Sequence, residues 1–430
     1  MPQITRHIGL SLGADICWPL AFEQILADSK LDLKLGKDSV QFACERVTLE
    51  PFPLAAGCKY DVVVDRLTHW LALRREWIKK CILMDGLYVY NNPWSVQSYE
   101  KHSSYCAMLA LGMPVPKTMM VPQKNYEPKP DLDFTLKTYA RLFDLGKIGE
   151  QVGLPAFMKP YDGGGWQGVT KLDTEAELRQ AYENSEKWLM HVQQAVAGFD
   201  LFVRAVGIGP QVRLMKYDAS QPLHGRYTTA RDFCSAEEEQ VMADTCLTIN
   251  AFFGWDFNSC EALRKDGVFH PIDFANPCPD NQVNSIHHHW PWYVMSNLKW
   301  AVFCAATRRP MRKTLDFEPF YAIAKQELPY REKLKGYARI ARERLQADAF
   351  TEFAAKHLRP LEEAATKWFQ SERCMEAITK KVAHMYPAHE VKDFSARFFE
   401  LVKQAVADGE HLKVAGAAPK AAVAGKEGKK

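Results

Sequence analysis

A lysine at the end of a short apolar strand, followed by three consecutive glycines, limits the folds that this chain can adopt. The stretch AFMKPYDGGGWQGV covers residues 156–169, and Lys159 ends its apolar run. Glycines allow positive φ and let backbone N–H groups approach a ligand, so such a loop can cover phosphate oxygens beside a lysine. A tight hairpin between two strands is the alternative interpretation, and the loop by itself is weak evidence against it.

The glycine loop differs from the two commonest nucleotide-binding motifs. No G-K-[ST] follows the glycines, as a Walker A loop requires, and no G-x-G-x-x-G opens a helix after the first expected strand. A second strand, VTKL, comes next, and then a helix whose Thr174 and Glu177 have the spacing of a capping box. The pattern therefore predicts a loop between two antiparallel strands.

The first segment of the chain alternates strands with helices. Apolar runs at 7–12 and 60–66 predict strands, and helical patterns follow them at 19–29 and 70–82. Such alternation indicates an α/β unit with a parallel sheet. The segment 121–134 is polar and carries three prolines, so we expect a loop there.

The pattern changes twice further along the chain. From about residue 153 short strands are joined by Gly-containing turns, and beyond about residue 296 the pattern is helical. Within the helical region, apolar side chains gather on a single face, namely Leu334, Tyr337, Ala338, Ala341 and Leu345. Residues 416–430 have almost nothing to bury, and we expect them to be disordered.

Charge and composition exclude several classes of protein. Residues 416–430 contain four Lys and one Glu, and their charge of +3 equals the net charge of the whole chain. The rest of the chain is therefore neutral, which gives no support for a nucleic-acid-binding surface. The 11 cysteines are scattered without a C-x-x-C, which argues against a zinc site or a disulfide framework. Neither a membrane-length apolar run nor a signal-peptide pattern occurs, so we expect a cytoplasmic protein without a membrane partner.

Two carboxylates flank a second expected hairpin, CEALRKDGVFHPIDFANPCPD, at residues 260–280. One strand starts at Glu261, the turn falls at residues 266–267, and the return strand ends at Asp273. Carboxylates at the far ends of paired strands can meet across the ladder. Asn276 would add a third oxygen ligand of the kind that Mg²⁺ prefers. The hairpin is therefore a candidate metal site.

The lysine, the glycine loop and the acidic hairpin occur in an order that resembles the ATP-grasp superfamily, over roughly residues 1–300. In that family a strand-borne lysine and a flexible glycine loop cover the ATP phosphates, and an acidic hairpin with an asparagine holds the metal. Asp273 and Asn276 are three positions apart here, whereas the family more often has two. Asp256 is an alternative first carboxylate, 17 positions before Asp273.

The resemblance implies a site for ATP and Mg²⁺. The hinge strand of the family is similar to residues 188–209, with glutamine where an acidic residue is commoner. The residues implied to bind the nucleotide are Lys101, Lys159, Gly163, Gly164, Gly165, Gln193, Gln194, Ala195, Val196 and Asp200. Those implied to bind metal are Glu261, Asp273 and Asn276. Asp200 would take the ribose hydroxyls, although a turn position after Gly198 explains it equally well.

The resemblance also implies a reaction. ATP-grasp ligases activate a carboxylate as an acylphosphate, which an amine then attacks. We therefore expect an ATP- and Mg²⁺-dependent carboxylate–amine ligase that acts on small-molecule or peptide substrates. An arginine fork would steady the acylphosphate oxygens, and a surface ion pair is the alternative for each candidate, which are Arg204, Arg213, Arg226 and Arg231.

Other functions stay possible beside that of a ligase. An ATP-grasp kinase or carboxylase would use another acceptor, and a non-catalytic nucleotide-binding module would keep the fold alone; a homo-oligomer is compatible with each of them. The histidines at 287–289 cannot all converge on one ion from a single regular element, because neighbouring side chains point in different directions. Substrate contacts or the start of the next helix are the alternatives, and we expect one of His287, His288 and His289 to reach the site because the segment directly follows the acidic hairpin.

The expected architecture has three folded regions and a tail. They are an α/β N-terminal, pre-ATP-grasp-like domain at 1–115, an α+β ATP-grasp domain at 116–300, a helical C-terminal region at 301–415 and the tail at 416–430.

Overall fold

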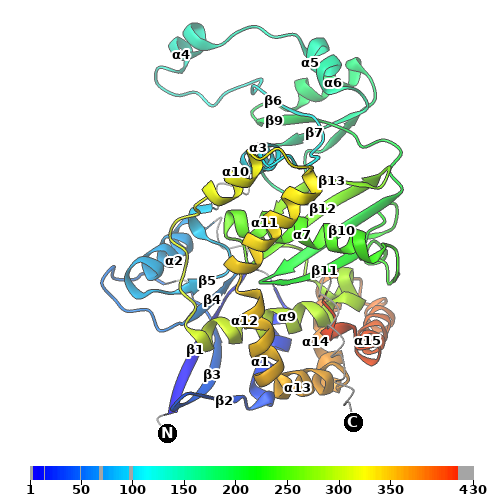
Figure 1. Cartoon of the computed structure of the whole chain (residues 1–430). Coiled ribbons are helices and arrows are strands. Elements are labelled where there is room, and N and C mark those ends of the chain that lie inside the picture. The colour runs from blue at the N-terminus through cyan, green and yellow to red at the C-terminus, as the bar shows by residue number, and fades with distance from the viewer. Residues whose placement is uncertain (1–2, 14, 49, 67–70, 96–99, 415–430) are drawn as a thin grey trace, which may run out of the picture.

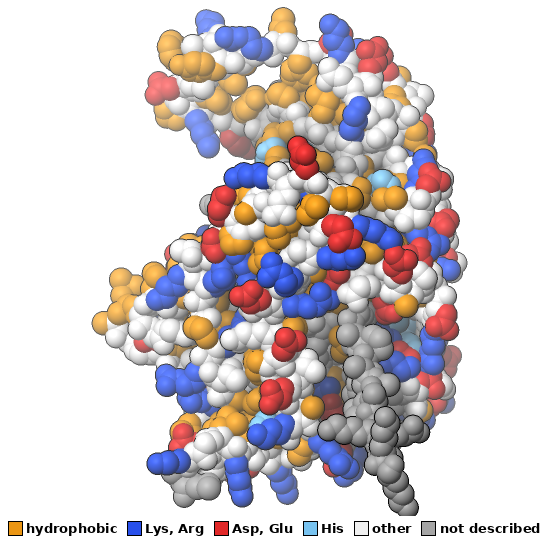
Figure 2. Space-filling view, in the orientation of Figure 1, with side chains coloured by type: hydrophobic (Ala, Val, Ile, Leu, Met, Phe, Trp, Pro, Cys, Tyr) orange, Lys and Arg blue, Asp and Glu red, His pale blue; other side chains and the backbone are white. Residues whose placement is uncertain are grey.

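The computed structural model describes residues 3–13, 15–48, 50–66, 71–95 and 100–414, and the tail expected at 416–430 lies outside these ranges. Within these ranges the chain has a mixed α/β structure with three sheets (Figure 1). One sheet forms a lobe at the top of Figure 1, and the N-terminal sheet and the last helices lie lower. In Figure 2 the outline of the molecule is indented between this lobe and the body below it.

The N-terminal sheet is mostly parallel, as the alternating pattern predicted. In sheet order its strands are β2 (Asp32–Leu35), β3 (Asp38–Arg46), β1 (Gln3–Ser11), β4 (Val62–Asp65) and β5 (Tyr88–Val89). β1 runs parallel to β3 and β4, and β4 to β5, whereas β2 is antiparallel to β3. β4 is buried along its whole length, which explains its unbroken run of valines. Helices α1 (Cys17–Ser29) and α2 (Ala72–Asp85) follow β1 and β4.

The upper lobe is an antiparallel sheet that carries the glycine loop. Its strand order is β6 (Thr118–Val121), β9 (Met190–Gln194), β7 (Ala156–Pro160) and β8 (Thr170–Leu172). The glycine loop joins β7 to β8, so the predicted antiparallel pair is confirmed. The capping box is also confirmed, because Thr174 and Glu177 satisfy each other's backbone at the start of α6 (Glu175–Asn184). Helices α4 (Leu132–Tyr139) and α5 (Leu145–Val152) precede β7, and no residue of α4 is buried.

The third sheet is antiparallel and carries the acidic hairpin. Its strand order is β11 (Gln211–Lys216), β10 (Leu201–Ile208), β12 (Phe257–Lys265) and β13 (Val268–Asn276). The predicted turn joins β12 to β13, and both its residues have positive φ, +51° at Asp266 and +73° at Gly267, as a two-residue hairpin favours. Helix α7 (Ala236–Phe253) packs on β10 and β11, and α3 (Lys101–Ala110) packs on β13.

The last region of the chain is helical, as predicted. Its helices are α9 (Trp290–Thr307), α10 (Glu318–Ala324), α11 (Tyr330–Arg344), α12 (Ala347–His357), α13 (Arg359–Phe369), α14 (Glu372–Met385) and α15 (Val391–Ala407). Four of the residues predicted for the apolar face lie in α11 and Leu345 directly follows it, and all five are buried. No helix among the described residues combines the length and apolar character needed to span a membrane.

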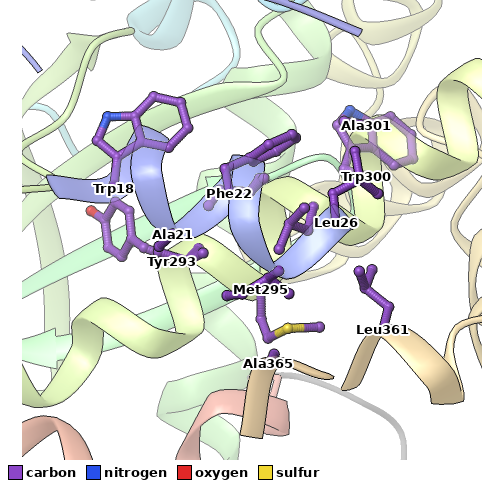
Figure 3. Close-up of a cluster of buried hydrophobic side chains, with 14 of the residues drawn as sticks. Trp18, Ala21, Phe22, Leu26, Tyr293, Met295, Trp300, Ala301, Leu361 and Ala365 are labelled. Carbon is purple, nitrogen blue, oxygen red and sulfur yellow. The ribbon is translucent and has the colours of Figure 1, made fainter. Parts of the chain in front are cut away.

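Helix α9 connects the N-terminal region to the helical end. Its residues are apolar around nearly the whole circumference, and such a helix must be covered on every side. Figure 3 shows Trp300 and Met295 of α9 near Phe22 of α1 and Leu361 of α13. These side chains belong to one buried cluster that also includes Ile8 of β1. The helical end and the N-terminal sheet therefore share a core.

Gly209, in the turn between β10 and β11, should tolerate no side chain. Its φ is +55°, and a Cβ there would lie 2.4 Å from the Trp300 ring. We expect Gly209→Ala to destabilise the protein by about 2–5 kcal/mol, combining overpacking with backbone strain. The matched control is Gly267→Ala, at φ +73° with open space around it, which should cost only about 1–2 kcal/mol. If thermal unfolding showed the same loss of stability for both variants, the close packing of Trp300 of α9 against Gly209 would be contradicted.

Candidate active site

Two buried lysines lie between the upper lobe and the hairpin sheet. The Nζ of Lys159, on β7, donates to Oε1 of Gln193 at 2.7 Å and to the backbone oxygen of Ile272 at 2.9 Å. The Nζ of Lys101, at the start of α3, donates to the backbone oxygen of Gly163 at 2.6 Å and lies 3.7 Å from Oδ2 of Asp273. The two lysines predicted to bind phosphate are thus brought together beside one carboxylate of the hairpin.

The acceptor for Lys159 exists because β13 is irregular. Glu261 pairs with Asp273 and Ala262 pairs with Pro271, so Ile272 is an extra residue on β13. A bulged residue is left out of the ladder, and its carbonyl is available to other donors. The Ile272 oxygen accepts from Lys159 and, at 2.6 Å, from the hydroxyl of Tyr105.

A second irregularity explains the unusual spacing of the last two predicted metal ligands. Ser259 pairs with Asn276 and Glu261 pairs with Asp273, so β13 advances three residues while β12 advances two. Ser259 and Glu261 lie on one face of β12, because side chains alternate along a strand. The bulge therefore brings Asn276 to the same face as Asp273, although the two are three positions apart.

Several polar atoms on this face have no hydrogen-bond partner within the described residues. They are Oγ of Ser259, Oδ1 of Asp273, Nδ2 of Asn276 and Nε of Arg204, all buried. Buried polar atoms in native proteins are nearly always paired, and the amide atoms of an asparagine can exchange places within the same shape. The face therefore suits an additional polar ligand.

The donor set would need ligand oxygens to complete a metal site. Among the described residues, no group of three or more His, Cys, Asp and Glu side chains is arranged to hold a metal ion. Glu261, Asp273 and Asn276 supply two carboxylates and one amide. Mg²⁺ commonly takes one or two carboxylates and completes its octahedron with water and phosphate oxygens. The residues present fit that kind of ion.

Charges on the two sides of the site are incompletely balanced. Burial lowers the pKa of the Lys159 ammonium to about 8, and Lys101 acts in the same direction while Asp273 opposes it. Burial also raises the pKa of Glu261, which Arg204 opposes from 2.8 Å across the ladder. Both shifts disfavour the charged forms. A ligand that carries phosphates and a cation would reverse both of them.

The glycine loop is free to accept contacts from outside. Gly163 and Gly165 have φ of +90° and +68°, and a Cβ built on Gly163, Gly164 or Gly165 meets nothing within 4 Å. A pocket of about 300 Å³ lies against the loop, with Trp188 of the neighbouring turn in its wall. The three consecutive glycines therefore have open space around them, whereas a Cβ on Gly168, later in the same loop, would lie 2.8 Å from the Trp188 ring.

The predicted adenine hinge is only partly available. The buried Gln193 binds Lys159 and, through Nε2, Oγ1 of Thr118, whereas the Gln194 side chain is exposed. The N–H of Ala195 donates to the backbone oxygen of Pro155 at 2.9 Å. Ala195 and Val196 directly follow β9. Ala195 therefore has no free N–H for a ligand in this state.

The predicted ribose ligand has a protein partner. The carboxylate of Asp200 accepts two hydrogen bonds from Arg264, at 2.8 and 3.1 Å, and this interaction lowers the pKa of Asp200. Asp200 is exposed, so both oxygens also meet solvent.

One of the four predicted arginines lies beside the acidic hairpin. Arg204, on β10, pairs with Glu261 and donates to the hydroxyl of Tyr227. Arg226 lies in the loop after β11, where its Nε donates to the backbone oxygen of Gln221 at 3.0 Å. Arg226 is thus used to fold its own loop.

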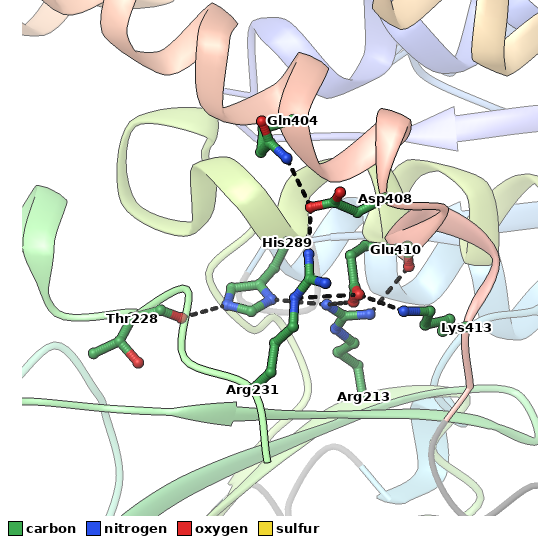
Figure 4. Close-up of polar contacts among 8 residues, drawn as sticks. All are labelled: Arg213, Thr228, Arg231, His289, Gln404, Asp408, Glu410 and Lys413. Atoms are coloured by element: carbon green, nitrogen blue, oxygen red, sulfur yellow. Dashed lines mark hydrogen bonds and ion pairs between the residues drawn. The ribbon is translucent and has the colours of Figure 1, made fainter. Parts of the chain in front are cut away.

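The other two arginines bind the C-terminal end of the described chain, as Figure 4 shows. Arg213, on β11, donates to Oε2 of Glu410 at 2.7 Å and lies 3.3 Å from Nδ1 of His289. Arg231 pairs with Asp408 and lies 3.6 Å from Oε1 of Glu410. The carboxylate groups that follow α15 therefore hold both arginines.

The three adjacent histidines do not converge, as the sequence predicted. All three are buried in a short 3₁₀ turn, and Nε2 of His289 lies 2.9 Å from the backbone oxygen of Thr228. The ring of His287 stacks on Phe398 of α15. His289 contacts the Arg213 cluster, and we assign none of the three to the face that carries Glu261.

Sequence reasoning missed two residues of the site and gave a third a different role. Tyr105 and Ser259 were not predicted as site residues, and Gln193 was predicted to bind adenine, whereas here it binds Lys159. Tyr105 could have been found from its position four residues after Lys101, which places both side chains on one face of α3. The positions of Ser259 and Gln193 depend on strand register, which the sequence did not define.

Comparison with known proteins gives partial matches. No protein-family model matches the chain. A D-alanine–D-alanine ligase A of Chromobacterium violaceum is 39% identical over 66 residues, which are 15% of this chain, so the chain spans only 18% of that relative's length.

Two solved structures match a large part of this chain. A RimK domain ATP-grasp protein of Sphaerobacter thermophilus matches with a TM-score of 0.44 and 13% identity, over 64% of this chain and 92% of that one. D-alanyl-alanine synthetase A of Vibrio cholerae matches with a TM-score of 0.47 and 14% identity, over 72% of this chain and 99% of that one.

Proposed function

We propose that the chain is an ATP-grasp enzyme that uses ATP and Mg²⁺ to join a carboxylate to an amine. One observation carries the proposal: Lys101 and Lys159 meet the Glu261–Asp273 pair between two antiparallel sheets, and polar atoms there lack partners among the described residues. This cluster contains both ammonium groups and carboxylates. It is therefore suited to a ligand that also carries both charges, such as phosphates with their cation.

The residues divide by charge into two functions. Lys101, Lys159 and the backbone of the glycine loop would hold phosphate oxygens, while Glu261, Asp273 and Asn276 would hold Mg²⁺. Bound Mg²⁺ would neutralise phosphate charge and so favour attack at the terminal phosphorus. Lys159 uses two of its three N–H donors in this structure, so the third is available to a phosphate oxygen. Its lowered pKa is consistent with an ammonium that gains stability when an anion arrives.

Arg204 is the arginine best placed to act on the acyl group. Its Nε has no partner within the described residues, and its terminal nitrogens already lie against Glu261 and Tyr227. A guanidinium held in this way presents a fixed donor to a developing oxyanion. Arg213 and Arg231 are held by Glu410 and Asp408, and Arg226 by its own loop, so we propose a supporting role for those three.

The proposed reaction has two balanced steps. A carboxylate oxygen of the first substrate forms a bond to the terminal phosphorus of ATP, and the bond to ADP breaks. The amine nitrogen of the second substrate then forms a bond to the acyl carbon, phosphate leaves, and the amine proton passes to solvent.

The experiment that tests this function measures ADP release with Mg²⁺ over a matrix of amino acids, dipeptides and amines, followed by mass spectrometry of the products. A carboxylate labelled with ¹⁸O should transfer one labelled oxygen to the released phosphate. A phosphorylated acceptor that forms without an amine would identify a kinase instead. ATP binding without turnover over the whole matrix would favour a non-catalytic module.

The affinity for ATP should depend on pH through Lys159. Because the pKa of Lys159 is about 8 in the free protein and an anion stabilises the ammonium, the contribution of Lys159 to the affinity should be constant below about pH 8 and should fall above it, by up to about tenfold per pH unit. Lys159→Arg stays charged throughout this range, and its affinity should not fall. Titration calorimetry from pH 7 to 9.5 measures both. If the affinity for ATP changed with pH in the same way in the natural chain and in Lys159→Arg, the role of Lys159 would be contradicted.

Asp273→Asn should remove the Mg²⁺ dependence of binding. The exchange keeps the shape of the side chain but removes the charge, so affinity for ATP with Mg²⁺ should fall at least tenfold, while affinity without Mg²⁺ should hold or rise. The control is Asp266→Asn on the same hairpin, an exposed turn residue with φ of +51° that asparagine tolerates. Equal behaviour of the two variants would exclude Asp273 as a metal ligand.

A further inference from the structure

Two histidines lie beside the phosphate-binding lysines and have no role in the proposed reaction. His191, on β9, stands directly opposite Lys159 in the strand ladder. His102 lies in the first turn of α3, next to Lys101. The Nε2 of His191 and the Nδ1 of His102 are 3.4 Å apart, and the two rings stack with centroids 5.6 Å apart. The pair therefore joins the lobe sheet to α3.

His191 is buried in positive surroundings. It is only 1% exposed, and its Nδ1 has no hydrogen-bond partner among the residues that the structure describes. Burial lowers its pKa to about 3, and the charges of its basic neighbours act in the same direction. The first turn of α3 adds the partial positive charge of its backbone N–H groups. The imidazole is therefore kept neutral, with one ring nitrogen unsatisfied.

The groups around the pair come from every element packed against it. α3 supplies Tyr105, whose ring centroid lies 5.6 Å from that of His191. β6 pairs with β9 and places Met120 opposite His191, and residues 118–121 contain no titratable side chain. α3 also places Sγ of Cys106 3.9 Å from Nε2 of His102. The remaining charged groups of this region are Glu100, Lys101, Lys159, Asp162, Glu261 and Asp273. Asp273 lies against Lys101, so it already partners another cation.

We propose that His102 and His191 form a proton-accepting element of the phosphate site and that nucleotide binding is coupled to uptake of a proton from solvent by this pair. The proposal rests on the proposed ATP site. Phosphates at Lys101 and Lys159 would bring several negative charges to a region where lysines now disfavour an imidazolium. A proton shared between the two rings would keep the hydrogen bond between Nε2 of His191 and Nδ1 of His102. Nδ1 of His191, which is unsatisfied here, would gain a hydrogen-bond acceptor.

The test is titration calorimetry of ATP with Mg²⁺ at pH 6.5 in two buffers that differ in ionisation enthalpy. The natural chain is compared with His191→Phe, which keeps the ring stacked on its neighbours, and with His389→Gln, an exposed control. Ionisation of ATP itself is common to all three and cancels. The natural chain and the control should take up more protons than His191→Phe. Their affinity should also fall more steeply between pH 6 and 7.5.

A second measurement covers the case in which His191→Phe fails to fold. In the natural chain with ¹⁵N-labelled histidine, adding ATP with Mg²⁺ should move one set of ring nitrogen signals toward imidazolium values. That shift should be lost in His102→Gln, which changes an exposed residue. If the natural chain and His191→Phe bound ATP with equal proton uptake, and the histidine ring nitrogen signals did not move, the coupling alone would be overturned. Absence of ATP binding by the natural chain would overturn the proposed function, and the coupling with it.

Discussion

The candidate site depends on the need of two buried ammonium groups for acceptors. Lys159 finds one in the backbone oxygen of Ile272, which is available only because β13 contains a bulge at that residue. The next irregularity in the same ladder brings Asn276 onto the face of Asp273. One deformed strand therefore binds the lobe lysine and the α3 tyrosine, and it carries two of the three proposed metal ligands, Asp273 and Asn276. A regular β13 would separate these groups.

The helical end of the chain supports the sheet that carries this strand. α9 packs into the core shared with the N-terminal sheet, and the residues after α15 return to β11, where Glu410 meets Arg213 in a buried ion pair. Breaking such a pair costs more than its formation contributes, because a single buried charge is left unpaired. The end of the described chain thus belongs to the structure around the site.

The sequence predicted the local features well and the long-range ones poorly. The turn at 266–267, the capping box of Thr174 and the strand before the glycine loop follow from patterns within a few residues, and the structure confirms them. β2 and β3 went unrecognised, although Leu33 and Val40 are buried on either side of a turn at Gly36. The contact of Arg213 with Glu410 spans 197 residues, and no local pattern signals it. Bulges shift register by one residue without a change in composition, so the spacing of Asp273 and Asn276 could only be interpreted from the folded ladder.

The central claim is that phosphates and a cation belong between the two lysines and the acidic hairpin. The most direct test is a crystal structure of the protein with Mg²⁺ and a non-hydrolysable ATP analogue. The account predicts phosphate oxygens at about 2.7–3.2 Å from the Nζ atoms of Lys101 and Lys159, with Mg²⁺ between Glu261 and Asp273. A nucleotide bound elsewhere, with Lys159 still on Gln193 and Ile272, would contradict it.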